Sequence, residues 1–146
     1  MLTPLSRLGS PQTLLGVAPG AGNQFTITIP KQQIFRPQFL HFQLTTDANV
    51  GNRYAGITFN DAAGLNYNIT PETPIVASTV IQVSGVSGLG IDSHLTSTTL
   101  MYSLPSEFYL LGDTDIVSQV DGIQVGDVIE NIRLFGSFWA QTTDLS

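Results

Sequence analysis

From residue 24 onward, the chain consists of short runs in which apolar and polar residues alternate. In the segment 25–29 every second residue is apolar, threonines stand between them, and Pro30 ends the run. Between 40 and 45 the apolar residues Leu40, Phe42 and Leu44 again alternate with polar ones. A repeat of two residues is typical of a strand with one buried face. The pattern therefore predicts strands in both segments.

The rest of the chain continues in the same way. Further strands are predicted at 53–60, 65–70, 75–83, 96–103, 107–111 and 115–120, with a long one at 128–140. Turn residues separate them, at 49–52, 61–64, 70–74, 85–90, 112–113 and 121–122. No window has the 3.6-residue repeat of a helix. Short strands at regular spacing without helices predict an all-β, antiparallel sandwich or barrel, and a jelly-roll β-sandwich fits the number of strands.

The long last strand carries large apolar residues on both of its predicted faces. One face would hold Ile132, Leu134, Gly136 and Phe138, and the other Ile129, Asn131, Arg133, Phe135, Ser137 and Trp139. A strand that is apolar on both faces is typically covered on both. We therefore expect it in the middle of a sheet, with its second face covered by the N-terminal segment or by a neighbouring subunit.

The first 22 residues differ from the rest of the chain. They contain three prolines, which break helices, and they lack the alternation of a strand. This predicts an extended N-terminal arm, 1–22, and a β-sandwich domain, 23–146. Six apolar residues suggest that the arm lies on an apolar surface of this domain or of a neighbour; together with Trp139, these predicted partner-binding residues are Leu2, Leu5, Leu8, Leu14, Leu15 and Val17. An ordinary frayed terminus is the alternative.

Composition narrows the possible functions. The chain has 146 residues, the size of one domain, and it has no cysteine, which excludes disulfide scaffolds and thiolate metal sites. Charged residues make up only 11%, the net charge is −6, and the five basic residues are scattered, so nucleic acid is not an expected partner. No apolar run reaches the roughly 20 residues of a membrane span, and no export signal is visible. A polar surface of uncharged residues suits a protein packed against other proteins.

Residues capable of catalysis are few. The run Asp92-Ser93-His94 holds the residue types of a catalytic triad, but neighbours on a strand point to opposite faces. The glycines at 85–90 precede no helix that could bind phosphate, and the two histidines have no evident partners. The three glutamates, Glu72, Glu107 and Glu130, are far apart in the sequence. We therefore expect no enzyme, no catalytic residue and no cofactor.

Two binding alternatives remain open at this level. Calcium could bind oxygen ligands from Asp113, Asp115, Asp121 and Asp127, although aspartate beside glycine is more typical of turns, and no metal site is expected. A glycan could stack on aromatic rings, since the chain has Trp139 and four tyrosines, Tyr54, Tyr67, Tyr102 and Tyr109. An exposed tyrosine beside Trp139 in a concave site would favour this glycan-binding alternative.

The order of features from about residue 38 to residue 140 is also informative. It runs through the segments 44–53, 60–64 and 74–78, then through Leu104-Pro105, Leu111-Gly112 and the segment 124–129 that leads into the last strand. In this order the chain resembles small structural proteins of tailed bacteriophages. The resemblance is one of spacing and includes no catalytic signature.

The resemblance implies a β-sandwich subunit of the virion, most simply a capsid decoration or cement protein on the capsid exterior. Its partners would be the major capsid protein and further copies of itself, bound through the sandwich and the arm. A tail, vertex or fibre-associated module that binds a receptor or glycan is the alternative. Within the matching region, Asp47 and Arg53 are expected to form an ion pair that holds a loop, with Gly51 at a positive φ.

Overall fold

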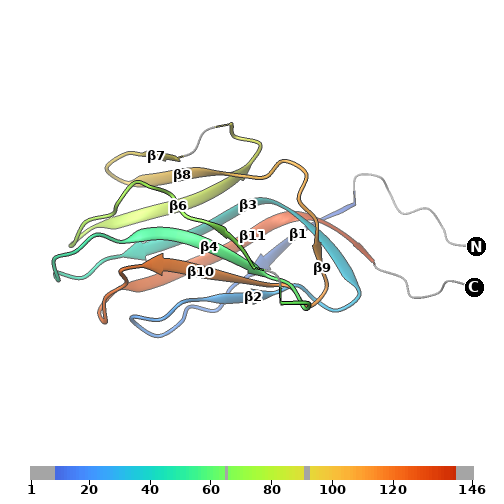
Figure 1. The fold of residues 1–146 in the computed structure, drawn as a ribbon, viewed down its shortest axis with the longest axis horizontal. Helices are drawn as coiled ribbons and strands as arrows, with labels where there is room; N and C mark the ends of the chain where they lie inside the picture. The colour runs from blue at the N-terminus through green and yellow to red at the C-terminus, as the bar shows by residue number, and fades with distance from the viewer. Residues whose placement is uncertain (1–8, 65, 91–92, 141–146) are drawn as a thin grey trace, which may run out of the picture.

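The protein is an all-β sandwich of two packed sheets, which confirms the predicted fold class (Figure 1). The computed structural model describes residues 9–64, 66–90 and 93–140. The strands are β1 (Ser10–Leu15), β2 (Thr26–Thr28), β3 (Gln33–Thr45), β4 (Tyr54–Asn60), β5 (Asn66–Ile69), β6 (Val80–Ser87), β7 (Ser93–Leu95), β8 (Thr99–Leu104), β9 (Leu110–Leu111), β10 (Asp115–Asp121) and β11 (Val128–Ala140). The described residues include no helix, and therefore none that could cross a membrane.

The strands pair in a nested order. The larger sheet has the order β1-β11-β3-β6-β8-β7, with β9 also paired to β3, and the smaller sheet has the order β2-β10-β4-β5. The first strand thus pairs with the last, β2 with β10, β3 with β6 and β4 with β5, all antiparallel. The segment from β7 to β9 interrupts this nesting, and β8 runs parallel to β6.

The core lies between the inner faces of the two sheets. Alternate residues of β3, including Phe42 and Leu44, are fully buried, as are Ile57 of β4 and Ile116 of β10. Phe25, just before β2, meets Phe42 of the other sheet edge to face, with ring centroids 5.3 Å apart. The alternation read from the sequence therefore marks the inward side chains.

Several elements differ from the prediction. The expected arm contains a strand: β1 pairs with β11 over its full length, so the predicted boundary after residue 22 does not separate an arm from the sheet. Pro11 is tolerated there because β1 is an edge strand and can lack one backbone donor. The strand predicted at 75–83 is β6, which spans Val80–Ser87. Ile75 lies outside it and forms an isolated β-bridge with Arg53. The strand β7 was not predicted.

The faces of β11 also need correction. Ile129 and Ile132 are both buried, although strict alternation places them on opposite faces. The register with β3 shifts between Glu130 and Arg133, and Asn131 has a positive φ of 55°, so a bulge returns the apolar residues to the core. The second face of β11 is only partly covered within the described chain: Ser137 is buried and Trp139 half-buried, but Arg133 and Phe135 are exposed. The N-terminal segment lies beside the strand as β1 and not over this face.

Candidate functional site

The predicted loop-holding residues come together around a buried arginine. Arg53 Nη2 lies 2.7 Å from Asp47 Oδ1, so the expected ion pair is present, and Gly51 has a φ of 152°. Arg53 Nη1 donates to the backbone oxygens of Asn49 and Gly51, at 2.9 and 2.7 Å. These bonds fix the loop between β3 and β4 around the guanidinium group.

A second carboxylate, Asp127, completes this cluster. Arg53 Nε and Nη2 donate to its two oxygens at 2.9 and 3.0 Å, and both side chains are fully buried. The backbone N–H groups of Asp47 and Gln124 donate to the same carboxylate, each at 2.8 Å. Every N–H of the guanidinium and both carboxylate oxygens therefore have partners, as a buried ion pair requires. The sequence predicts Asp127 only as a turn residue or a calcium ligand, whereas in the structure it is the buried counter-charge of Arg53.

The electrostatics of the cluster follow from these contacts. Burial by itself would raise the pKa of Asp127, but the hydrogen bond from Arg53, the two backbone hydrogen bonds and the Arg53 charge together hold that pKa below its usual value. The hydrogen bond to Asp127 raises the pKa of Arg53. Both groups are thus charged at neutral pH, and the cluster ties the loop after β3 to the turn before β11.

The predicted partner-binding residues do not form one surface. Leu2, Leu5 and Leu8 lie outside the described residues. Leu14 points inward from β1 and packs against the core, whereas its neighbour Leu15 is 73% exposed. Val17 is exposed in the segment that follows.

Leu15 belongs to the outer face of the larger sheet, which is partly apolar. Thr13 of β1 is opposite Phe135 of β11, which is opposite Phe39 of β3, and Val86 of β6 continues the row. Directly opposed residues share a face, so these side chains and Leu15 all point outward. Phe39 and Phe135 are 37% and 41% exposed. We call Leu15, Phe39, Phe135 and Val86 the outer apolar patch.

Polar residues beside the patch are joined across the strands. Gln82 Nε2 donates to Gln43 Oε1 at 2.8 Å, and Gln43 Nε2 donates to Glu130 Oε1 at 2.9 Å. His41 stacks parallel to Phe39 and shares a hydrogen bond of 3.3 Å with Ser84 Oγ. Burial, and then the Arg133 charge, lower the pKa of His41, so the imidazole is neutral at neutral pH. The outer face is therefore ordered by these contacts, and it also carries two charged residues, Glu130 and the exposed Arg133, which is opposite Leu15 and His41.

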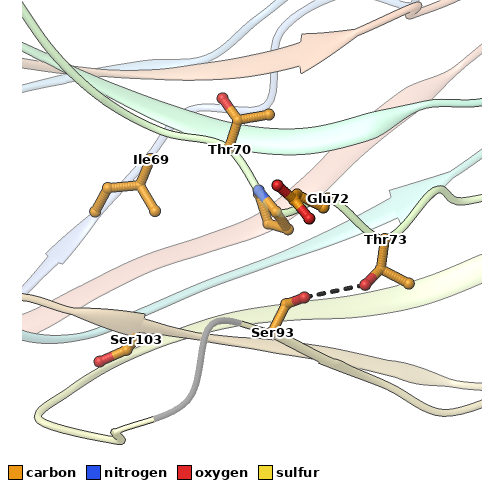
Figure 2. A pocket seen from close by; sticks show the side chains of 7 residues that line it. Ile69, Thr70, Glu72, Thr73, Ser93 and Ser103 are labelled. Atoms are coloured by element: carbon orange, nitrogen blue, oxygen red, sulfur yellow. Dashed lines mark hydrogen bonds between the residues drawn. The ribbon is translucent and has the colours of Figure 1, made fainter.

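The clefts of the described chain include two of several hundred cubic ångströms. One, of about 520 Å³, is lined by Ile69, Thr70, Pro71, Glu72, Thr73, Ser93 and Ser103, and Figure 2 shows Thr73 and Ser93 joined by a hydrogen bond of 3.0 Å. Glu72 is the only acidic group among these residues, and no histidine lines the cleft with it. The lining residues thus offer no acid and base pair.

The other cleft, of about 410 Å³, is lined by Phe59, Asp61, Asn66, Tyr67, Phe108, Tyr109, Leu110, Leu111 and Thr114. Trp139, the remaining predicted partner-binding residue, is half-buried, and its ring lies 5.7 Å from that of Tyr109. The sequence offers Trp139 and Tyr109 as possible stacking residues, but their 30-residue separation does not indicate that they are neighbours. We refer to this hollow as the aromatic cleft.

The triad-like run does not form a triad in the described chain. Ser93 and His94 are consecutive in β7, so they point to opposite faces, and Ser93 bonds Thr73. Asp92 lies outside the described residues. Within residues 9–64, 66–90 and 93–140, no three histidine, aspartate or glutamate side chains gather where they could hold a metal ion.

Comparison with known proteins gives no family. A scan against protein-family models finds no match, and a search of curated proteins finds none either. The resemblance to phage virion proteins therefore remains a prediction from the residues.

Proposed function

We propose that this protein is a non-enzymatic structural subunit of a virion, a decoration or cement protein on the capsid exterior. It would bind the major capsid protein and neighbouring copies of itself, and so stabilise the capsid lattice. The observation that carries the proposal is the outer apolar patch, which the described chain leaves uncovered. The resemblance over residues 38–140 gives the class of partner.

The patch has the properties of a protein contact. Its two phenylalanines are directly opposite each other on the central strands β3 and β11, which neighbouring strands hold in place. Burying apolar surface contributes roughly 25 cal/mol per Å². The adjoining Gln43, Gln82 and Glu130 form a hydrogen-bonded row, so a partner meets polar groups that are already ordered.

The free edge of β1 offers a second contact. In the described part of the chain, β1 pairs with β11 on one side and with no strand on the other. A partner strand can add to such an edge through backbone hydrogen bonds. Leu15 is close to this edge and belongs to the outer apolar patch, so a neighbour bound there would cover both features.

The strand order supports a jelly-roll subunit. In the nested pairs, β1 pairs with β11, β2 with β10, β3 with β6 and β4 with β5, which is how a long hairpin of eight strands pairs before it rolls up. We include the jelly roll in the proposal, with β7, β8 and β9 as an insertion. Jelly rolls recur in viral capsid proteins, and also in lectin domains, so the fold alone does not assign the function.

The copy number of the protein in purified virus particles tests the proposal. Quantitative mass spectrometry against the major capsid protein should give a ratio near one or a simple fraction of it. A few copies per particle would overturn the decoration role in favour of a vertex or tail position. Absence from the particle would overturn the virion assignment altogether.

Surface variants test the patch itself. Phe135→Ser and Leu15→Ser should reduce occupancy on particles, because each removes apolar area from the outer apolar patch. Val50→Ser is the matched control, since Val50 is an exposed apolar residue in the loop between β3 and β4, away from that face. Equal occupancy for all three variants would exclude the patch as the contact.

A further inference from the structure

The aromatic cleft combines stacking surfaces with a few polar groups. Its lining residues come from the end of β4, the start of β5 and the segment around β9. Cavities of a few hundred cubic ångströms with apolar walls and a few polar side chains are typical of small-ligand sites. Its volume of about 410 Å³ falls in that range.

Three of its rings form a fixed cluster. Phe59 and Phe108 meet edge to face with centroids 4.8 Å apart. Tyr67 is tilted against both, 6.4 Å from Phe59 and 5.7 Å from Phe108. Phe59 is buried in the core, so the cluster is anchored to the sandwich and its shape does not depend on a ligand.

Two tyrosines present their rings to solvent in this cleft. Tyr67 is 50% exposed and Tyr109 is 52% exposed, although both contact other aromatic rings. Trp139 lies beside the cleft, where its ring contacts that of Tyr109. Rigid, half-exposed aromatic rings supply contact area at a low entropy cost, and such rings are enriched where proteins bind ligands.

The polar groups of the cleft select the kind of ligand. Asp61, Asn66 and Thr114 contribute a carboxylate, an amide and a hydroxyl. Asp61 Oδ1 accepts a hydrogen bond from the Ala63 backbone, which orients the carboxylate in its turn. None of the described lining residues is a lysine, arginine or histidine, so nothing there would neutralise an anionic ligand.

We propose that the aromatic cleft binds a neutral saccharide. A pyranose ring has an apolar C–H face that packs on an aromatic ring, and its rim of hydroxyl groups can bond to carboxylate and amide side chains. Tyr67 and Tyr109 would supply the stacking surfaces, and Asp61 and Asn66 the hydrogen-bonding groups. Sialylated or phosphorylated sugars would be repelled by Asp61. This inference does not depend on the capsid role, because the cleft and the outer apolar patch use different residues.

The cleft lined by Thr73 and Ser93 shows that volume alone does not make a saccharide site. It is larger, at about 520 Å³, yet no aromatic side chain is among the residues that line it. Unlike the aromatic cleft, it therefore lacks a flat surface on which a sugar ring could pack.

The test is a glycan array that carries neutral oligosaccharides of glucose, galactose, mannose and N-acetylglucosamine, together with sialylated versions of the galactosides. The full chain should bind at least one neutral glycan, and sialylation should weaken binding. Trp139 is the only tryptophan, so titration of the bound oligosaccharide should change its fluorescence. Tyr67→Ala and Tyr109→Ala should each weaken affinity at least tenfold.

Phe135→Ala is the matched control, because it removes a partly exposed aromatic ring from the outer face of the larger sheet. It should leave affinity unchanged, and thermal unfolding should show that all three variants fold. No binding to any neutral glycan would overturn the proposal. So would a bound glycan whose affinity survives both tyrosine substitutions.

Discussion

At the scale of single residues, Arg53 and its two carboxylates are the most constrained group in the molecule. The guanidinium is completely buried and depends on Asp127 for two of its hydrogen bonds. A buried charge that loses its counter-charge typically costs 3–5 kcal/mol, because it cannot return to water without unfolding. The cluster therefore contributes to stability more as a completed set than through any one bond.

Asp127→Asn should lower the free energy of unfolding by about 3 kcal/mol. The amide keeps one oxygen acceptor but places an NH₂ group against the N–H donors of Arg53 or Gln124. Urea denaturation measures the change. Asp121→Asn, an exposed aspartate in the same part of the chain, is the control and should change stability by less than about 0.5 kcal/mol. Equal stability of the two variants would show that Arg53 does not need this carboxylate.

The same carboxylate should make stability depend on pH. The pKa of Asp127 is lowered in the folded protein, so at acidic pH the unfolded chain binds a proton before the folded one does. Its contribution is therefore complete above the unfolded pKa of about 3.9 and is lost as pH falls through the lower folded value. Urea midpoints measured from neutral pH down to about pH 3 should fall more steeply for the wild type than for Asp127→Asn. Parallel curves would contradict this assignment.

The sequence predicts only part of this cluster. Asp47, Gly51 and Arg53 are close in the chain and share one loop, so local reasoning brings them together. Asp127 is separated from Arg53 by 74 positions, and nothing in a single sequence reports contacts over that distance. The one available signal is its place in the turn 124–127, just before a strong strand, which ordinary turn chemistry also explains.

At the scale of elements, β1 shows where pattern reading fails. Its six residues include Pro11 and two adjacent leucines, so alternation is obscured, and the strand forms because β11 provides a partner for each residue. The strands β4, β10 and β11 lie close to their predicted positions, because both the core and the alternation act on them, whereas β3 begins at Gln33, seven residues before the predicted segment 40–45. Edge and short strands depend on their neighbours, which the sequence does not identify.

The two leucines of β1 give a matched pair. Leu14→Ala should destabilise the protein by about 2 kcal/mol, since Leu14 packs against the core. Leu15→Ala should change stability by less than about 0.5 kcal/mol, since that side chain points to solvent. Thermal or urea unfolding distinguishes them. Two equally mild effects would mean that β1 is not held in the sheet in solution.

At the scale of the whole molecule, the nesting of the strands determines how the chain can fold. Ser10 pairs with Phe138, and Thr28 pairs with Asp115. In each sheet, a strand from the N-terminal part of the chain therefore pairs with a strand from the C-terminal part. Only the β4–β5 and β7–β8 pairs of the described chain join consecutive strands; most other pairs join strands that are distant in the sequence. The entropy cost of closing the long loops is incurred before such distant pairs contribute to stability. Folding is therefore expected to be slow and cooperative.

We therefore expect refolding in milliseconds to seconds, as for other all-β sandwiches, with backbone and side-chain probes changing together. Trp139 lies on β11, opposite Ile34 of β3, so its fluorescence reports when the last strand joins the larger sheet. Stopped-flow circular dichroism follows the strands as a whole. If β-structure formed well before the fluorescence changed, then part of the sandwich would be stable without β11, and the nested pairing would not be the step that limits folding.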